Sequence, residues 1–351
     1  MPECTKVLVV QTAFLGDVVL TLPLIQELKR HHPDCLIDVV VVPRCAEALE
    51  NHPDIHKTIM YDKRGMDKGI QGLLKMAKHL RQQGYDLALV PHRSLRSAVL
   101  TRIAGIPVRI GFNTSAGRWL FTKQIEYRKN LHEVDRNLEL LKPLEIIPSS
   151  KALPALYPSD EDVKIVDLFL ATLKLLEKKF IAIAPGTVWN TKRWLRERFI
   201  ELAKKIIEQR HNVILVGGKE DRQLSEEIIS YVQSEYIASC VGKLTILQSA
   251  ELIRRSAALV SNDSAPMHLA VAMRTPVVAI FGATVPEFGF APRGERDVVI
   301  ETTGLSCRPC SIHGGEKCPI TTFECMKQIT VERVMENVER ITSGSNARDV
   351  R

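Results

Sequence analysis

The feature that most constrains this chain is a strand-to-helix corner at residues 259–270. An apolar strand pattern runs into Ser261-Asn-Asp-Ser-Ala-Pro266 and then into an apolar helix pattern that carries His268. Asp263 or Ser264 is suited to cap that helix, and Pro266 suits its first turn because the missing N–H would have no partner there. Such a helix start attracts anions, phosphate above all. The same pattern also describes an ordinary capped turn in a parallel sheet.

A second corner lies near the N-terminus. Residues 6–11 read as a buried strand, residues 12–16 as a tight loop ending in Gly16, and residues 17–30 as an amphipathic helix. Asp17 is therefore expected at a helix start beside the carboxyl end of a strand, which is where open α/β sheets bind ligands. Its carboxylate is either a site residue or only a helix cap.

The alternation of strands and helices continues along the chain and predicts two α/β domains with parallel sheets. A length of 351 residues suits two domains, and four prolines in residues 143–158 indicate the boundary. We expect domains over 1–155 and 156–351. The predicted strands cover residues 7–11, 37–42, 57–60, 86–90, 108–110, 180–184, 212–216, 257–261 and 276–281.

Charge is distributed unevenly, although the net charge of the chain is only +7. Residues 91–130 contain eight Lys and Arg residues, among them Arg93 and Arg96, against Glu126 alone, and so also sum to +7. This segment is either a solvated basic surface or a site for an anionic partner such as a phosphorylated lipid or a membrane surface. Nucleic acid is disfavoured because none of the known binding motifs is present.

Two further loops in the second half carry polar residues after a strand. Ala184-Pro-Gly-Thr-Val-Trp-Asn-Thr-Lys-Arg-Trp194 places Thr187 and Lys192 where they can reach a phosphate. Glu220 follows Val216-Gly-Gly-Lys, a position suited to binding ribose hydroxyls. Together with Asp263, these corners indicate one nucleotide diphosphate site.

These motifs in combination resemble the ADP-heptose:lipopolysaccharide heptosyltransferases, most closely the heptosyltransferase II branch. The similarity rests on Gly16-Asp17 with Thr-Leu-Pro at 21–23, on PGT…KRW in residues 185–194 and on SNDSAPMHLA in residues 261–270, and it extends to residues 281–286 and Cys307-Arg-Pro-Cys310. It implies a GT-B fold, in which two Rossmann-like domains face a cleft, with the acceptor on the first domain and the nucleotide sugar on the second.

The resemblance also implies roles for single residues. Asp17 is the expected general base, Lys192 neutralises the diphosphate and Glu220 holds the ribose. Thr187, Asp263, Ser264 and His268 are expected to line the phosphate site. The expected reaction is an inverting transfer of heptose from ADP-L-glycero-D-manno-heptose to the lipopolysaccharide inner core, with no metal cofactor. The expected acceptor is an anionic lipid A core, bound by Arg93 and Arg96.

Two other functions fit the general pattern. A doubly wound fold also serves NAD-dependent oxidoreductases, but no G-x-G-x-x-G follows Val10. A non-catalytic nucleotide-sugar-binding protein would not need Asp17. The chain contains no run of about 20 apolar residues that could span a membrane and no clear signal peptide, so we expect a cytoplasmic protein that associates peripherally with the inner membrane.

Four cysteines form an array of spacing C-x2-C-x7-C-x6-C at Cys307, Cys310, Cys318 and Cys325. In a cytosolic protein such spacing favours a structural zinc or iron–sulfur site over disulfides, with reduced thiols as the alternative. The helix predicted over residues 70–82 places Ile70, Leu74 and other apolar residues on one side and basic residues on the other. It either packs on the sheet or contacts a membrane surface.

Overall fold

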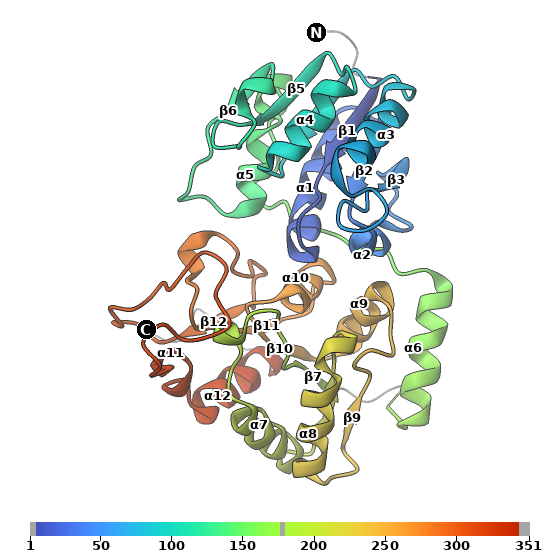
Figure 1. The fold of residues 1–351 in the computed structure, drawn as a ribbon. Coiled ribbons are helices and arrows are strands. Elements are labelled where there is room, and N and C mark those ends of the chain that lie inside the picture. Colours follow the sequence, from blue (N-terminus) through green and yellow to red (C-terminus); the bar gives the residue numbers. More distant parts are fainter. Residues whose placement is uncertain (1–4, 176–179, 344–351) are drawn as a thin grey trace. The chain divides into compact units, whose positions relative to one another are not determined.

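The computed structural model describes residues 5–175 and 180–343 (Figure 1). Contacts divide the chain into two compact units, one ending at Tyr157 and the other beginning at Pro158. Each unit contains a six-stranded sheet in which all neighbouring strands are parallel. The α/β fold predicted from the alternation of strand and helix patterns is confirmed.

In the first unit the strand order is β3-β2-β1-β4-β5-β6. The strands are β1 (Lys6–Val10), β2 (Leu36–Val41), β3 (Lys57–Met60), β4 (Leu87–Val90), β5 (Val108–Phe112) and β6 (Lys123–Ile125). The helices are α1 (Leu15–His31), α2 (Pro43–Ala46), α3 (Gly69–Arg81), α4 (Leu95–Ile103) and α5 (Glu133–Glu139). This strand order reverses direction between β1 and β4, which places the topological switch point beside the β1–α1 loop, which precedes Asp17.

In the second unit the order is β12-β11-β10-β7-β8-β9, which repeats the same winding. The strands are β7 (Phe180–Ala184), β8 (Asn212–Leu215), β9 (Ile237–Ser239), β10 (Ala258–Asn262), β11 (Val277–Phe281) and β12 (Val298–Glu301). The helices are α6 (Asp160–Thr172), α7 (Arg196–Glu208), α8 (Arg222–Val232), α9 (Ile246–Arg255), α10 (Ala265–Ala272), α11 (Glu324–Lys327) and α12 (Val331–Thr342). The switch point here lies between β7 and β10.

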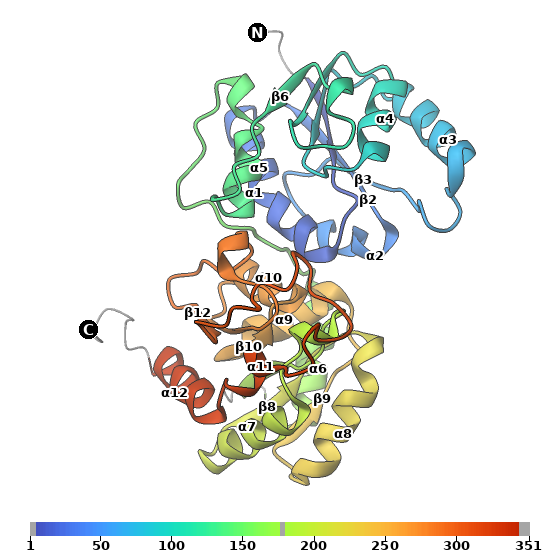
Figure 2. The same ribbon diagram turned by 60° about the vertical axis from the view of Figure 1, so that its left-hand side comes forward.

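Central strands β7 and β11 are apolar along their whole length, and β1 is apolar after Lys6, because helices cover both faces of each sheet, as the two views in Figures 1 and 2 show. A cluster of buried side chains around Leu8, Val40 and Ala88 fills one layer of the first unit. In the second unit a larger cluster surrounds Trp194 and Phe199, whose rings meet edge to face at 5.1 Å. The strand ends that carry the polar loops are thereby held on rigid sheets.

Candidate active site and the family to which the chain belongs

The first corner forms at the carboxyl end of β1. Helix α1 begins at Leu15, two residues earlier than predicted, so Asp17 occupies its first turn. Asp17 Oδ2 accepts a hydrogen bond from the Phe14 N–H at 3.1 Å, so this carboxylate does serve as a helix cap. Thr21 Oγ1 donates to the Asp17 carbonyl at 2.8 Å and holds the turn in place. A helix start at a switch point is also the position where a carboxylate meets a ligand, so capping and catalysis are compatible here.

The neighbouring strand β4 brings a histidine to the same edge, which the sequence had not indicated. His92 Nδ1 lies 2.9 Å from Thr12 Oγ1 in the β1–α1 loop and 3.1 Å from Ser97 Oγ. Burial lowers the pKa of His92 to about 4, and the charges of Lys63 and Arg93 act in the same direction. His92 is therefore neutral near pH 7 and tethers the loop that precedes Asp17.

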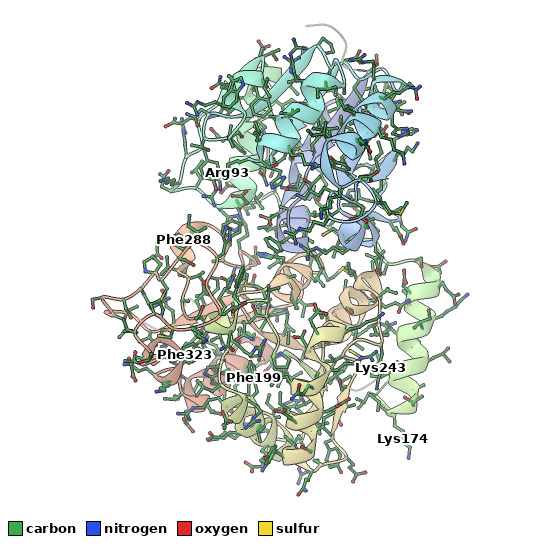
Figure 3. The ribbon with its side chains drawn as sticks, in the orientation of Figure 1. Arg93, Lys174, Phe199, Lys243, Phe288 and Phe323 are labelled. Atoms are coloured by element: carbon green, nitrogen blue, oxygen red, sulfur yellow. The ribbon has the colours of Figure 1, made fainter. Side chains whose placement is uncertain are left out.

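The two arginines expected at the acceptor site have different surroundings. The Arg93 guanidinium lies over the Tyr127 ring at 4.0 Å from the centroid, and Figure 3 shows the residue near α5. Arg96 instead donates to the carbonyl oxygens of Asp67 and Gly69, both at 2.8 Å, and to the Tyr61 hydroxyl at 2.5 Å. Arg96 thus fixes the loop between β3 and α3. The basic segment does not form one uniform surface, because several of its cations bind the backbone of their own unit.

Helix α5 adds a buried carboxylate beside Asp17. Glu133 Oε2 lies 2.8 Å from Arg136 Nε, and the Tyr127 hydroxyl donates to the same oxygen at 3.3 Å. Burial raises the pKa of Glu133 to about 7 against the opposing charges of Arg136 and Arg93, and the negative charge of Asp17 adds to the rise. Glu133 was not predicted, because only the packing of α5 against α1 brings it to this edge.

The raised pKa of Glu133 makes a prediction for stability. Since the folded protein holds this proton more tightly than the unfolded chain, stability is highest below the unfolded pKa and falls as the pH rises toward 7. Glu133→Gln should flatten the dependence of Tm on pH between about 4.5 and 7, the interval between the usual and the raised pKa. Thermal melts across that range measure it. Glu126→Gln, at an exposed carboxylate, is the control, and an unchanged slope in Glu133→Gln would contradict the prediction.

In the second unit the loop after β7 carries Thr187 and Lys192. The Arg193 guanidinium donates to the Thr187 carbonyl at 3.0 Å and closes this loop on itself. Asn262, at the end of β10, accepts from the Trp194 N–H and donates to the Pro185 carbonyl, both at 2.9 Å. The two loops that flank the switch point are therefore fastened to each other.

Lys192 and Asp263 form an ion pair at that position. Lys192 Nζ lies 2.6 Å from Asp263 Oδ2, with side chains only 14% and 8% exposed. The hydroxyl of Thr284, which follows β11, donates to the same carboxylate oxygen at 2.7 Å. The Asp263 carboxylate does not itself attract a phosphate group, because both are negatively charged. Its chemistry suits orienting the ammonium group of Lys192.

Helix α10 begins beside this pair, as predicted. Ser264 is the residue before the helix and has extended backbone angles, and its side chain makes no capping hydrogen bond within the described residues. Pro266 has no N–H to donate in the first turn. Any backbone hydrogen bond from this turn to an anion would have to come from the N–H groups of its neighbours. His268 is 5% exposed and belongs to the buried part of the helix.

The loop after β8 forms a short turn over Lys219–Asp221. Glu220 is exposed, whereas Asp221 accepts from the Gly218 N–H at 3.1 Å and its carboxylate presses against Gly186, where an added Cβ would lie 2.0 Å from Asp221 Oδ1. Gly186 is thus required because the β7 and β8 loops approach so closely. Glu220 remains accessible to a ligand.

The four cysteines for which a metal site was expected lie close enough together for Cys307, Cys310 and Cys318 each to add to the rise that burial causes in the pKa of Cys325. Among residues 5–175 and 180–343, no three His, Cys, Asp or Glu side chains come together in a group that could hold a metal ion. Cys325 lies in α11 as part of the hydrophobic core, where burial raises its pKa to about 11. Cys307, Cys310 and Cys318 are partly exposed, and both the metal site and the reduced thiols stay predictions.

The segment that contains these cysteines, residues 307–325, holds in place the loops around the Lys192–Asp263 ion pair. Arg308 donates to the carbonyl oxygens of Gly282 and Thr284 and pairs with Glu301 at 2.8 Å, which fixes the loop that carries Thr284. Thr191 exchanges two hydrogen bonds with Gly315, at 2.9 and 2.8 Å. The spacing of the cysteines gave no signal for this role, because the contacts are made by the residues between them.

Comparison with known proteins identifies the family. Residues 73–317 match the model of glycosyltransferase family 9 (heptosyltransferase). Lipopolysaccharide heptosyltransferase 2 of Salmonella typhimurium is 28% identical over 352 residues, which cover 96% of this chain and 99% of that protein. The structure of ADP-heptose lipopolysaccharide heptosyltransferase II of E. coli aligns with a TM-score of 0.80 and 25% identity, covering 97% of this chain and 99% of that one.

A family 9 glycosyltransferase from Veillonella parvula has the same fold, with a TM-score of 0.87, 23% identity, and coverage of 98% of this chain and 99% of its own. The predicted GT-B class and the resemblance noted in the sequence are thereby confirmed. Within the part of the chain that the structure describes, none of the helices has the length and apolar character needed to span a membrane. With its family model matched over 245 residues, between 73 and 317, this chain belongs to glycosyltransferase family 9, the heptosyltransferases, and is a glycosyltransferase.

Proposed function

We propose that this enzyme transfers heptose from ADP-L-glycero-D-manno-heptose to the inner core of lipopolysaccharide, in the manner of a heptosyltransferase II. The observation that carries the proposal is the Lys192–Asp263 pair at the switch point of the second unit, where the fold presents a fixed positive charge beside a helix start. Relatives named lipopolysaccharide heptosyltransferase 2 that align over most of the chain support the choice of sugar and acceptor.

The proposed chemistry is a single displacement with inversion at the anomeric carbon. Asp17 takes the proton of the acceptor hydroxyl while that oxygen forms the new glycosidic bond and the bond to the ADP oxygen breaks. A positioned base of this kind contributes roughly 10²–10⁴ in rate. ADP is a good leaving group, so it requires neutralisation of charge and no proton.

The nucleotide site is proposed in the second unit. Lys192 is directed by Asp263 and Thr284 toward the diphosphate, and preorganised charge of this kind stabilises the departing group. Thr187 and the first turn of α10 after Ser264 supply further donors, with His268 beneath them, and Glu220 is placed to accept from ribose hydroxyls. Because Lys192 supplies the positive charge, the proposal includes no divalent metal ion.

The acceptor is proposed to be an anionic, lipid-linked core saccharide bound to the first unit, with the enzyme cytoplasmic and peripheral to the inner membrane. Exposed Arg93 and half-buried Lys63 lie at the same sheet edge as Asp17. A cationic edge of this kind favours phosphate and carboxylate groups.

The proposal is tested by incubating the purified enzyme with ADP-heptose and a set of separated inner-core acceptors. Formation of ADP, a mass gain of one heptose and an inverted anomeric configuration by NMR are the expected results. ADP binding without transfer to any acceptor would favour a non-catalytic nucleotide-sugar-binding protein instead.

The different contacts of Arg93 and Arg96 make a prediction for acceptor binding. Arg93→Gln should raise the acceptor KM about tenfold and flatten its dependence on salt, because a charge that attracts an anion through water is screened over about 8–10 Å. Arg96→Gln should instead lower Tm, since it releases the carbonyl oxygens of Asp67 and Gly69. Steady-state kinetics at two salt concentrations and thermal melts separate the two effects. Equal acceptor KM values in Arg93→Gln and the wild type would remove Arg93 from the acceptor site.

A further inference from the structure

Three large apolar side chains stand out on the surface of the first unit. Met66, Ile70 and Leu74 are 90%, 75% and 48% exposed, respectively. Ile70 and Leu74 are one helical turn apart on α3, and Met66 lies in the loop that leads into it. The sequence pattern placed Ile70 and Leu74 on the apolar side of the helix. In the structure, the buried apolar side chains of α3 are Met76, Ala77 and Leu80, and Ile70 and Leu74 are exposed.

The charges around these side chains are predominantly positive. Residues 62–81 contain six Lys and Arg residues and two acids, Asp62 and Asp67. Both acids are engaged by backbone groups: Asp62 accepts from the N–H groups of Gly65 and Met66, at 2.9 and 3.1 Å, and Asp67 accepts from the Asp62 N–H at 3.1 Å. The exposed cations of the same segment are Arg64, Lys68, Lys75 and Lys78, and Lys78 lies one helical turn after Leu74.

The loop that presents Met66 is held in a defined position. Asp67 packs so closely on α3 that a Cβ at Gly72 would lie 2.2 Å from its carbonyl group. Arg96 binds the carbonyl oxygens of Asp67 and Gly69 at 2.8 Å. The exposure of Met66 and Ile70 is therefore a property of an anchored loop and helix start.

This surface adjoins the sheet edge that carries Asp17. The loop follows the carboxyl end of β3, and Lys63 Nζ donates to the Thr12 carbonyl in the β1–α1 loop at 2.6 Å. Figure 2 shows α3 at the outer side of its unit, next to α4. A partner on this surface would thus lie beside the proposed acceptor site.

We propose that Met66, Ile70 and Leu74, with Arg64, Lys68, Lys75 and Lys78, form a docking surface for an anionic phospholipid bilayer; we call it the α3 surface. Apolar side chains that enter the boundary of the acyl chains, surrounded by cations that meet lipid phosphates, are the combination that holds a protein at such an interface. The inference rests on the proposed function in one respect: a lipid-linked acceptor embedded in that bilayer would be presented to the edge that contains Asp17.

Vesicle co-sedimentation tests the docking surface. The full-length enzyme should bind vesicles of phosphatidylethanolamine with phosphatidylglycerol and bind pure phosphatidylcholine vesicles at least tenfold more weakly. The triple variant Met66→Ser, Ile70→Ser and Leu74→Ser should lose at least tenfold in the partition coefficient. Lys75→Gln with Lys78→Gln should lose severalfold and show a weaker salt dependence. Leu168→Ser, at a residue of α6 that is 68% exposed, is the matched control and should bind as the wild type does.

The proposal would be overturned if the triple variant bound anionic vesicles as tightly as the wild type does. It would also be overturned if the wild type did not bind anionic vesicles. Sedimentation velocity data in which the α3 surface mediates dimerisation of the enzyme in the absence of lipid would overturn it as well. A second assay keeps this result separate from the proposed function: the triple variant should retain wild-type turnover on a delipidated core acceptor and lose it on acceptor embedded in vesicles. Absence of transfer by the wild type to either acceptor would refute the proposed activity, while the vesicle binding data would still decide the docking surface.

Discussion

Replacing Asp17 with Asn should reduce kcat by about 100-fold or more while the Kd for ADP stays within about twofold of the wild type. Asn keeps an oxygen that can accept from the Phe14 N–H, so the cap of α1 survives, whereas the amide cannot take a proton from the acceptor. A hundredfold loss corresponds to about 2.7 kcal/mol of transition-state stabilisation. Single-turnover kinetics with ADP-heptose, together with calorimetry for ADP, measure both quantities.

The control for this variant is Asp17→Ser, which lacks the base and also lacks an oxygen long enough to accept from the Phe14 N–H. Both variants should be slow, and only Asp17→Ser should melt below the wild-type Tm, because it loses that hydrogen bond. If Asp17→Asn turned over at the wild-type rate, Asp17 would be a capping residue only. A parallel loss of Tm and activity in both variants would lead to the same conclusion.

Replacing Lys192 with Met should weaken ADP binding at least tenfold and lower kcat by about 10²–10³. The Met side chain preserves packing against Gly314, where an added Cβ would lie 2.8 Å from Lys192 Cγ, but it removes the positive charge. It also leaves the Asp263 carboxylate, which is 8% exposed, without its ion-pair partner beside the diphosphate. Repulsion between that carboxylate and the phosphates adds to the loss.

A double variant separates these two contributions. Lys192→Met with Asp263→Asn should recover part of the ADP affinity, because the unpaired negative charge is then gone. Glu220→Ala should raise the Kd for donor with a smaller effect on kcat, and Lys219→Ala, at an exposed neighbour, should change neither. Wild-type ADP affinity in both Lys192→Met and Glu220→Ala would rule out the proposed nucleotide site.

Several elements were predictable from local pattern alone. The strands over Lys57–Met60 and Phe180–Ala184 and the start of α10 agree with the predicted bounds, because apolar runs and capping residues are local signals. Strands β6, β9 and β12 were not predicted. They lie at sheet edges and have few buried residues. The sequences of β6 and β9 lack an apolar run, whereas β12 has a short one over residues 298–300 that was missed.

The candidate site was only partly predictable for a related reason. Asp17, Lys192 and Asp263 were recognisable because each follows a strand, and parallel strands all end at one edge of their sheet. That Lys192 and Asp263 form an ion pair, and that Thr284 and Arg308 support it, depends on loops separated by up to 116 positions between 192 and 308. No local pattern reports such contacts.

By itself, the sequence determined that the chain builds two parallel α/β sheets and which loops lie at their ligand-binding edges, since the periodicity of apolar residues and the order of strands and helices decide both. Only the tertiary structure decided what individual side chains do there. It assigned Arg96 to the loop before α3, buried Cys325 in the core, placed Glu133 beside Asp17 and left Met66 and Ile70 exposed. Each of these outcomes depends on which surfaces pack together, and packing joins residues that are distant along the chain.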